Sequence, residues 1–183
     1  MTEIERIDDQ FMTEIERIDD QLKRSLEGEA WHGPALEELL VDVTAEQAAA
    51  KPAPSVHSIW EIVLHIISTQ RLVCERLQGK PAAFEFDAQR FGFAATVLPA
   101  EADWPPITDQ SEAAWAGTKR ELRESTERLR KAIRLLDQSR LEEPIVEGFS
   151  SIYVTLHGTV QHNLYHGGQI ALLKKAFQTN SNL

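Results

Sequence analysis

The chain has 183 residues, of which 42% are hydrophobic and 26% charged, a balance typical of one globular domain spanning 1–183. Its net charge of −10 argues against a nucleic-acid partner, because an acidic surface repels phosphate backbones. A single cysteine permits no intrachain disulfide, and no apolar run reaches the length of a membrane span, so we expect a cytoplasmic protein without a membrane partner.

An internal repeat opens the chain: "MTEIERIDDQF" (1–11) is followed by "MTEIERIDDQL" (12–22). Its 11-residue period is close to three helical turns and keeps the apolar residues on nearly one face, which predicts one long amphipathic helix. These apolar residues are Ile4, Ile7, Phe11, Ile15, Ile18, Leu22 and Leu26. The helix is expected to end by "EGEAWHGP" (27–34), where glycines and a proline interrupt the pattern. We interpret residues 1–11 as a duplicated N-terminal extension that packs against a second chain or frays.

Two capping-box patterns mark the next helix starts. After a short helical piece at 35–43, "TAEQ" (44–47) places a threonine three residues before a glutamine. "SIWE" (58–61) places a serine three residues before a glutamate and opens a second long helix of about 20 residues. Gly79 is expected to end that helix.

A long aromatic connection follows at 81–106, with no sustained period. We expect it to be irregular and to act either as a lid or as a plug for one end of the fold. "TDQSE" (108–112) opens a third long helix with Asp109 as its predicted N-cap, and the mixed charges at 119–134 are typical of a solvated helix face. A fourth helix runs from about 150 to 177. The predicted fold is therefore all-α, a four-helix bundle with a long irregular connection between helices 2 and 3.

The fourth helix contains the most informative stretch, "HNLYHGGQI" (162–170). His162 and His166 lie one helical turn apart, so both side chains leave the same face and can converge on one ion. Gly167 and Gly168 each cost roughly 1 kcal/mol relative to alanine inside a helix. Their presence predicts that bulk is excluded beside the pair, for close backbone packing or for a small molecule. Gln169 is a candidate to orient a ligand, although its helical phase differs from that of His162.

His65 lies in the middle of the second long helix, at the edge of its apolar stripe. Three histidines from two facing helices can supply three nitrogen ligands and leave an open position, as catalytic zinc sites require. The residues alone leave a second interpretation equally open, in which these are hydrogen-bonded packing histidines. His32, His57 and His157 are expected to be loop or packing residues, and Cys74 an inert core residue.

Other metal and nucleophile patterns are not supported. A zinc-protease helix needs glutamate after the first histidine, and position 163 is asparagine. Di-iron bundles need two Glu-x-x-His motifs, and the one candidate here is Glu29 with His32 at a helix end. Nothing resembles a Ser-His-Asp set or a phosphate-binding glycine loop.

Three segments together resemble the DinB-like (DinB/YfiT) family of metal-dependent enzymes: "WHGPALEELL" (31–40), "HSIWEIVLHI" (57–66) and "HNLYHGGQIALLKK" (162–175). The resemblance runs from about Met12 to Lys175. It implies a four-helix bundle in which one histidine of the second helix and two of the fourth hold a divalent ion. In this sequence these are His65, His162 and His166.

The resemblance implies an activity but does not fix the reaction. Similar proteins are S-transferases or isomerases that use a low-molecular-weight thiol such as bacillithiol, mycothiol or glutathione. We therefore expect a metal-dependent enzyme, with zinc or nickel, that activates water or such a thiol toward a small-molecule substrate, in an S-transferase-like or hydrolase-like reaction. The alternative is a non-catalytic bundle, clamped by its metal, that serves as a small-molecule binding or dimeric structural module. A homodimer is expected.

Overall fold

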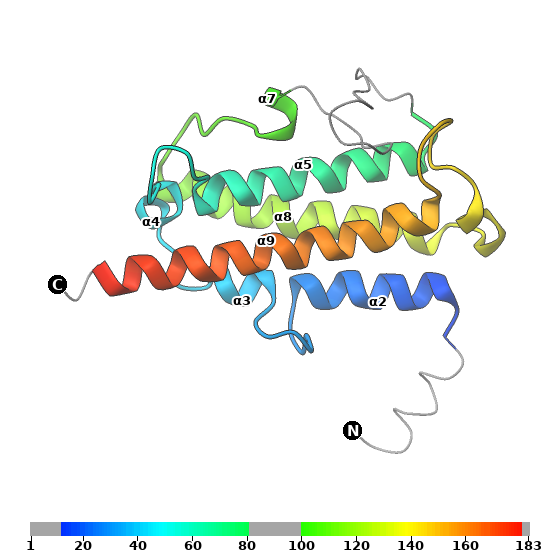
Figure 1. Cartoon of the computed structure of the whole chain (residues 1–183), viewed down its shortest axis with the longest axis horizontal. Coiled ribbons are helices and arrows are strands. Elements are labelled where there is room, and N and C mark those ends of the chain that lie inside the picture. Colours follow the sequence, from blue (N-terminus) through cyan, green and yellow to red (C-terminus); the bar gives the residue numbers. More distant parts are fainter. Residues whose placement is uncertain (1–11, 81–99, 181–183) are drawn as a thin grey trace, which may run out of the picture.

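The computed structural model describes residues 12–80 and 100–180, and within them four long helices lie side by side (Figure 1). These are α2 (Glu14–Leu26), α5 (Ile59–Leu77), α8 (Glu112–Arg134) and α9 (Ile152–Asn180). The shorter elements are α3 (Leu36–Leu40), α4 (Ala45–Ala49), α7 (Ala100–Asp103) and the 3-10 helix η1 (Gln138–Glu142). An isolated bridge between Pro144 and Ser151 is the nearest approach to β structure in the described part of the chain. The predicted all-α four-helix bundle is confirmed.

Helix α2 begins later than the repeat predicts. Thr13 is its N-cap, with an extended backbone (φ −66°, ψ 163°), and its hydroxyl accepts from the Glu16 amide. The Glu16 carboxylate in turn accepts from the Thr13 amide at 2.7 Å. This reciprocal cap ends the helix on its N-terminal side, so the prediction of one continuous helix through both copies is wrong. Residues 1–11, with Ile4, Ile7 and Phe11, lie outside the described residues.

The other helix starts largely follow local capping chemistry. Thr44 and Ser58 cap α4 and α5 with complete capping boxes, as predicted. The predicted cap of α8, Asp109, is wrong, because Ser111 takes that position and accepts from the Ala114 amide at 3.2 Å. The Asp109 carboxylate instead accepts from the Ser111 amide at 2.8 Å and holds the turn just before the helix.

Two buried apolar clusters hold α5 and α9 against the rest of the bundle. One includes Ile66 of α5 and Ile170 of α9, and the other includes Val73 of α5 and Leu156 of α9. Burying such side chains is worth roughly 1.5–3 kcal/mol each, so apolar packing fixes these two helices at both ends of their contact. Between α5 and α8, Gln70 accepts hydrogen bonds from Ser125 and Thr126 and adds a buried polar link.

The α8 helix is less solvated than its charges suggest. Arg130 is only 13% exposed and donates to Asp19 of α2 at 2.8 Å, so this part of the predicted solvated face is an interhelical contact. Residues 81–99 of the long connection lie outside the described residues. The part that is described begins with α7, a short helix that the sequence did not predict and that lies above α5 in Figure 1. No helix in the described ranges has the length and apolarity needed to cross a membrane.

Candidate metal centre

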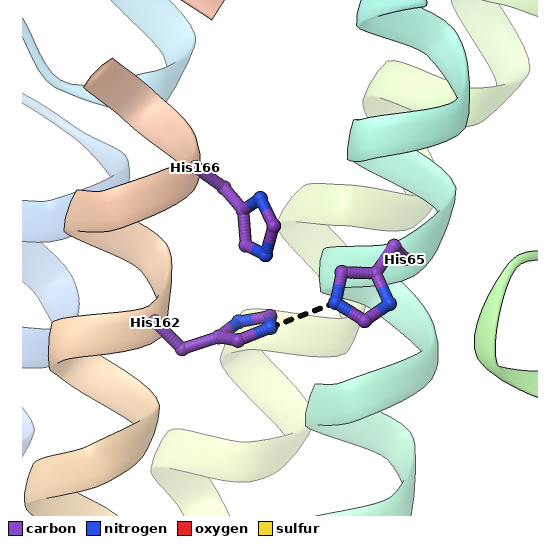
Figure 2. Close-up of side chains that lie close together, drawn as sticks. All are labelled: His65, His162 and His166. Atoms are coloured by element: carbon purple, nitrogen blue, oxygen red, sulfur yellow. Dashed lines mark hydrogen bonds between the residues drawn. The ribbon is translucent and has the colours of Figure 1, made fainter. Parts of the chain in front are cut away.

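Three histidines from two helices point toward one another, as Figure 2 shows. His65 comes from α5, and His162 and His166 come from α9. One ligand atom from each side chain can be chosen so that all three lie within 4.8 Å of one another. The closest pair are the Nε2 atoms of His65 and His162, which are 2.9 Å apart. The structure therefore brings together all three residues that the sequence singled out.

The helices place these rings largely out of water. His65 lies between Ile62 and Ile66, which are 2% and 0% exposed, and is itself 9% exposed. His166 is 5% exposed. The helical period turns the α9 pair toward α5, while the apolar clusters on both sides keep the two helices in fixed contact.

Burial sets the protonation state of the α9 pair. It lowers the pKa of His162 to about 3, with a further contribution from repulsion by His166 and His65. It is also the main cause that lowers the pKa of His166 to about 4. Both imidazoles are therefore neutral at pH 7, and a neutral imidazole has a nitrogen lone pair available for an ion.

The hydrogen bonds of the other ring nitrogens fix two tautomers. The Nδ1 atom of His65 faces two acceptors of Asp103, its carbonyl oxygen at 2.8 Å and its Oδ1 at 3.2 Å, so Nδ1 must carry the proton. The Nδ1–H group of His166 donates to Oε1 of Gln169 at 2.7 Å. In both rings the unprotonated nitrogen is therefore Nε2. In this ion-free arrangement Nε2 of His65 accepts a hydrogen bond from Nε2–H of His162 at 2.9 Å, and a bound ion would take the place of that proton. Gln169 thus contacts the cluster, and the histidine that it contacts is His166, not His162.

The geometry fits a small divalent ion. Ligand nitrogens about 2.1 Å from a tetrahedral ion are about 3.4 Å apart. The distances here, from 2.9 Å up to 4.8 Å, bracket that value, so small shifts of the side chains would complete the arrangement. Imidazole nitrogens suit zinc and nickel. In the described part of the chain, no carboxylate or thiol joins this group of three.

A family model described as the DinB superfamily matches residues 30–170. The chain belongs to the DinB superfamily. That superfamily is metal-binding, and the matched range contains all three clustered histidines. Searches of curated proteins and of solved structures gave no significant match.

The remaining histidines of this DinB superfamily member lie apart from the cluster. His57 stacks on Trp104, with ring centroids 3.6 Å apart, and His157 contacts the Glu14 carboxylate at 3.0 Å. His32 is exposed in the loop before α3. These placements agree with the predicted packing and loop roles. Cys74 is buried, and burial raises the pKa of its thiol.

The glycine doublet does not make room beside the histidines as expected. A Cβ atom at Gly167 would meet Leu36 at 3.6 Å and Leu39 at 3.8 Å, which is ordinary contact with α3 rather than with the cluster. A Cβ atom at Gly168 would meet nothing within 4 Å. The prediction that both positions exclude bulk is wrong, because Gly167 is buried on the α3 side and Gly168 is exposed.

Asp103 and Trp104 both touch His65 and were not predicted from the sequence. They lie in the aperiodic connection, and Asp103 is 38 residues from its partner in the chain. No spacing rule relates them to the histidines, so the sequence offered no signal for either.

Proposed function

We propose that this chain is a metal-dependent enzyme in which His65, His162 and His166 hold one divalent ion, zinc or nickel. The observation that carries the proposal is the convergence of three buried imidazoles, from two helices, with ligand atoms within 4.8 Å. The reaction proposed is attack by water or by a low-molecular-weight thiol on a small-molecule substrate, of the hydrolase or S-transferase type.

The number of ligands favours catalysis over a purely structural ion. Structural zinc sites usually have four protein ligands, whereas catalytic sites have three and keep a position open. Within the described residues this cluster offers three ligand atoms. The nearby Asp103 carboxylate is not a fourth, because it contacts Nδ1 of His65 and not Nε2. When bound, such an ion supplies Lewis acidity, which lowers the pKa of water or of a thiol that reaches it.

The chain's own residues support an external nucleophile. Cys74 is buried and its thiol pKa is raised, so this thiol is a poor nucleophile at neutral pH. Tyr165 is 66% exposed and its ring centroid lies 5.1 Å from that of His166. We assign Tyr165 a role in contacting the substrate, because it presents an aromatic surface beside the cluster.

A purely clamping role for the ion is disfavoured by the packing around it. Ile66 and Ile170 belong to one apolar cluster, and Val73 and Leu156 to the other, so α5 and α9 are joined by buried side chains on both sides of the histidines. A helix pair packed in this way does not require a metal to hold it together.

The test is an activity screen of ion-loaded protein. Zinc- and nickel-loaded samples are incubated with an electrophile and either bacillithiol, mycothiol or glutathione, and in parallel with ester and amide substrates without thiol. The control is His162→Ala at the same total metal concentration. We expect turnover that requires the ion and is lost in the variant. Ion-loaded protein that binds its metal tightly yet matches the variant in every assay would refute catalysis and favour the binding or structural module.

A further inference from the structure

Two residues outside the bundle restrain His65 from its outer side. They are Asp103, the last residue of α7, and Trp104, which follows it. Asp103 offers two acceptors to Nδ1 of His65, its backbone carbonyl at 2.8 Å and its carboxylate at 3.2 Å. Because both groups can only accept, they hold the proton on Nδ1 and leave the lone pair on Nε2, the atom that faces His162.

Trp104 restrains the plane of the same ring. Its indole is stacked on His65, with centroids 4.0 Å apart and planes within 5° of parallel. On its other face it is stacked on His57, at 3.6 Å and within 6°. The indole is therefore held between two imidazoles, and His65 cannot rotate about its Cβ–Cγ bond without losing this contact. The hydrogen bonds fix which nitrogen is protonated, and the stack fixes where the other one points.

The α7 segment is itself attached to α5. Ser68, less than one helical turn beyond His65, donates from its hydroxyl to the carbonyl of Ala102. Neighbouring α7 residues thus contact α5 through Ser68 and His65, and Trp104 adds the stack. His166 differs, because its Nδ1 partner, Gln169, is on its own helix. The Nδ1 partner of His65 therefore lies outside its own helix, whereas the Nδ1 partner of His166 lies within its own helix.

We propose that Asp103 and Trp104 are positioning residues, which hold His65 with Nε2 turned toward His162 and His166 and thereby set the affinity of the site for its ion. Carboxylate or carbonyl partners of a ligating histidine typically contribute 10- to 100-fold to metal affinity by orienting the ring. The proposal concerns the ion-binding step of the proposed function and does not depend on which reaction follows.

The first test measures ion affinity in purified full-length variants. The dissociation constant of Co²⁺ is measured by its visible absorption, and that of Zn²⁺ by competition with a chelating dye. We expect the double variant Asp103→Ala/Trp104→Ala to raise both constants by about 10- to 100-fold. Asp103→Asn and Trp104→Phe, which keep an acceptor and an aromatic face, should recover most of the affinity. Glu101→Ala is the matched control, because it removes an exposed acid from the same short helix.

Two outcomes of the affinity test would overturn the proposal. One is a double variant that binds within twofold of wild type. The other is an equal loss in Glu101→Ala, which would mean that net charge rather than ring orientation is responsible. Circular dichroism and the melting temperature of the ion-free proteins are measured alongside. We expect helical content to be retained in every variant, while the melting temperature falls where Trp104 is replaced by alanine, because Trp104 packs against one of the two apolar clusters.

A second measurement tests the positioning role in the ion-free protein, so it remains informative even if the wild type binds no ion. Its failure can therefore be told apart from failure of the proposed function. Nitrogen-15 NMR of the ion-free protein reports which nitrogen of His65 is protonated. We expect the Nδ1–H tautomer in wild type and in Glu101→Ala. The double variant loses the carboxylate and the stacked indole but keeps the Asp103 backbone carbonyl, so we expect a minor Nε2–H population to appear beside the Nδ1–H tautomer. A wild-type His65 protonated on Nε2, or a double variant with an unchanged spectrum, would contradict the positioning role.

Discussion

Acidification of the ion-free protein should destabilise it through two buried histidines. The pKa values of His162 and His166 are lowered from 6.5 to about 3 and about 4. The unfolded chain therefore binds protons at these positions below about pH 6.5, whereas the folded chain remains neutral there until much lower pH. The stability from burying neutral rings is present above pH 6.5 and is lost as the pH falls from 6.5 to about 4 for His166 and to about 3 for His162.

The size of the effect follows from the width of that window. At pH 5, an unfolded histidine with a pKa of 6.5 gains about 2 kcal/mol by protonation, since each pH unit corresponds to about 1.36 kcal/mol. Because the His162 side chain is partly exposed, its contribution to this change in the free energy of unfolding is smaller. We therefore expect the two histidines together to lower the free energy of unfolding by about 2–4 kcal/mol between pH 7 and pH 5.

Urea unfolding of chelator-treated protein at the two pH values measures this difference. The control is His162→Leu/His166→Leu, which keeps apolar bulk at both positions and removes both titrating groups. In this variant the fall in unfolding free energy between pH 7 and pH 5 should shrink by the same 2–4 kcal/mol, approximately. If the stability of this variant falls with pH as steeply as that of wild type, the loss comes from other groups and not from these two histidines.

Three further outcomes are expected. His162→Ala should weaken zinc binding by more than roughly 100-fold, the upper end of what the hydrogen-bond partners of a ligating histidine contribute. The variant should keep its helical circular dichroism, because the two apolar clusters do not contain this residue. Loss of helix would favour a structural clamp. Cys74 should react with a disulfide reagent in urea but only slowly in the native protein, since it is buried and its thiol pKa is raised; rapid native labelling would contradict this. Removal of residues 1–11 should leave zinc stoichiometry unchanged while weakening the expected homodimer, as measured by light scattering; a folded truncation that no longer binds zinc would show that the repeat contributes to the site.

The parts of the fold that the sequence predicted depend on contacts within one helical turn. Ser58 and Glu61 cap α5 because they are three residues apart, and His162 and His166 share a face because they are four apart. The capping box at Thr13 and Glu16 has the same spacing, but the prediction followed the apolar period through both copies of the repeat and overlooked this cap. The local cap decides this helix start, because it satisfies amide groups that would otherwise remain unpaired.

The parts that the sequence did not predict depend on long-range contacts. Asp103 and Trp104 reach His65 across 38 and 39 residues, through a segment without periodicity. The glycine doublet also required the fold, since only the position of α3 shows that Gly167 faces leucines and not the histidines. His65 itself was identified by the resemblance as much as by its place on the apolar stripe.

X-ray absorption of zinc-loaded protein is the decisive measurement for the three-histidine centre, because it counts the imidazole ligands of the ion itself. We expect one zinc per chain with three histidine nitrogens at about 2.0–2.1 Å and at least one further light-atom ligand. Each single alanine variant of His65, His162 and His166 should lose one imidazole contribution or lose the zinc. A spectrum with sulfur ligands, one with fewer than three imidazoles in wild type, or a purified protein that binds no divalent ion would contradict the three-histidine centre.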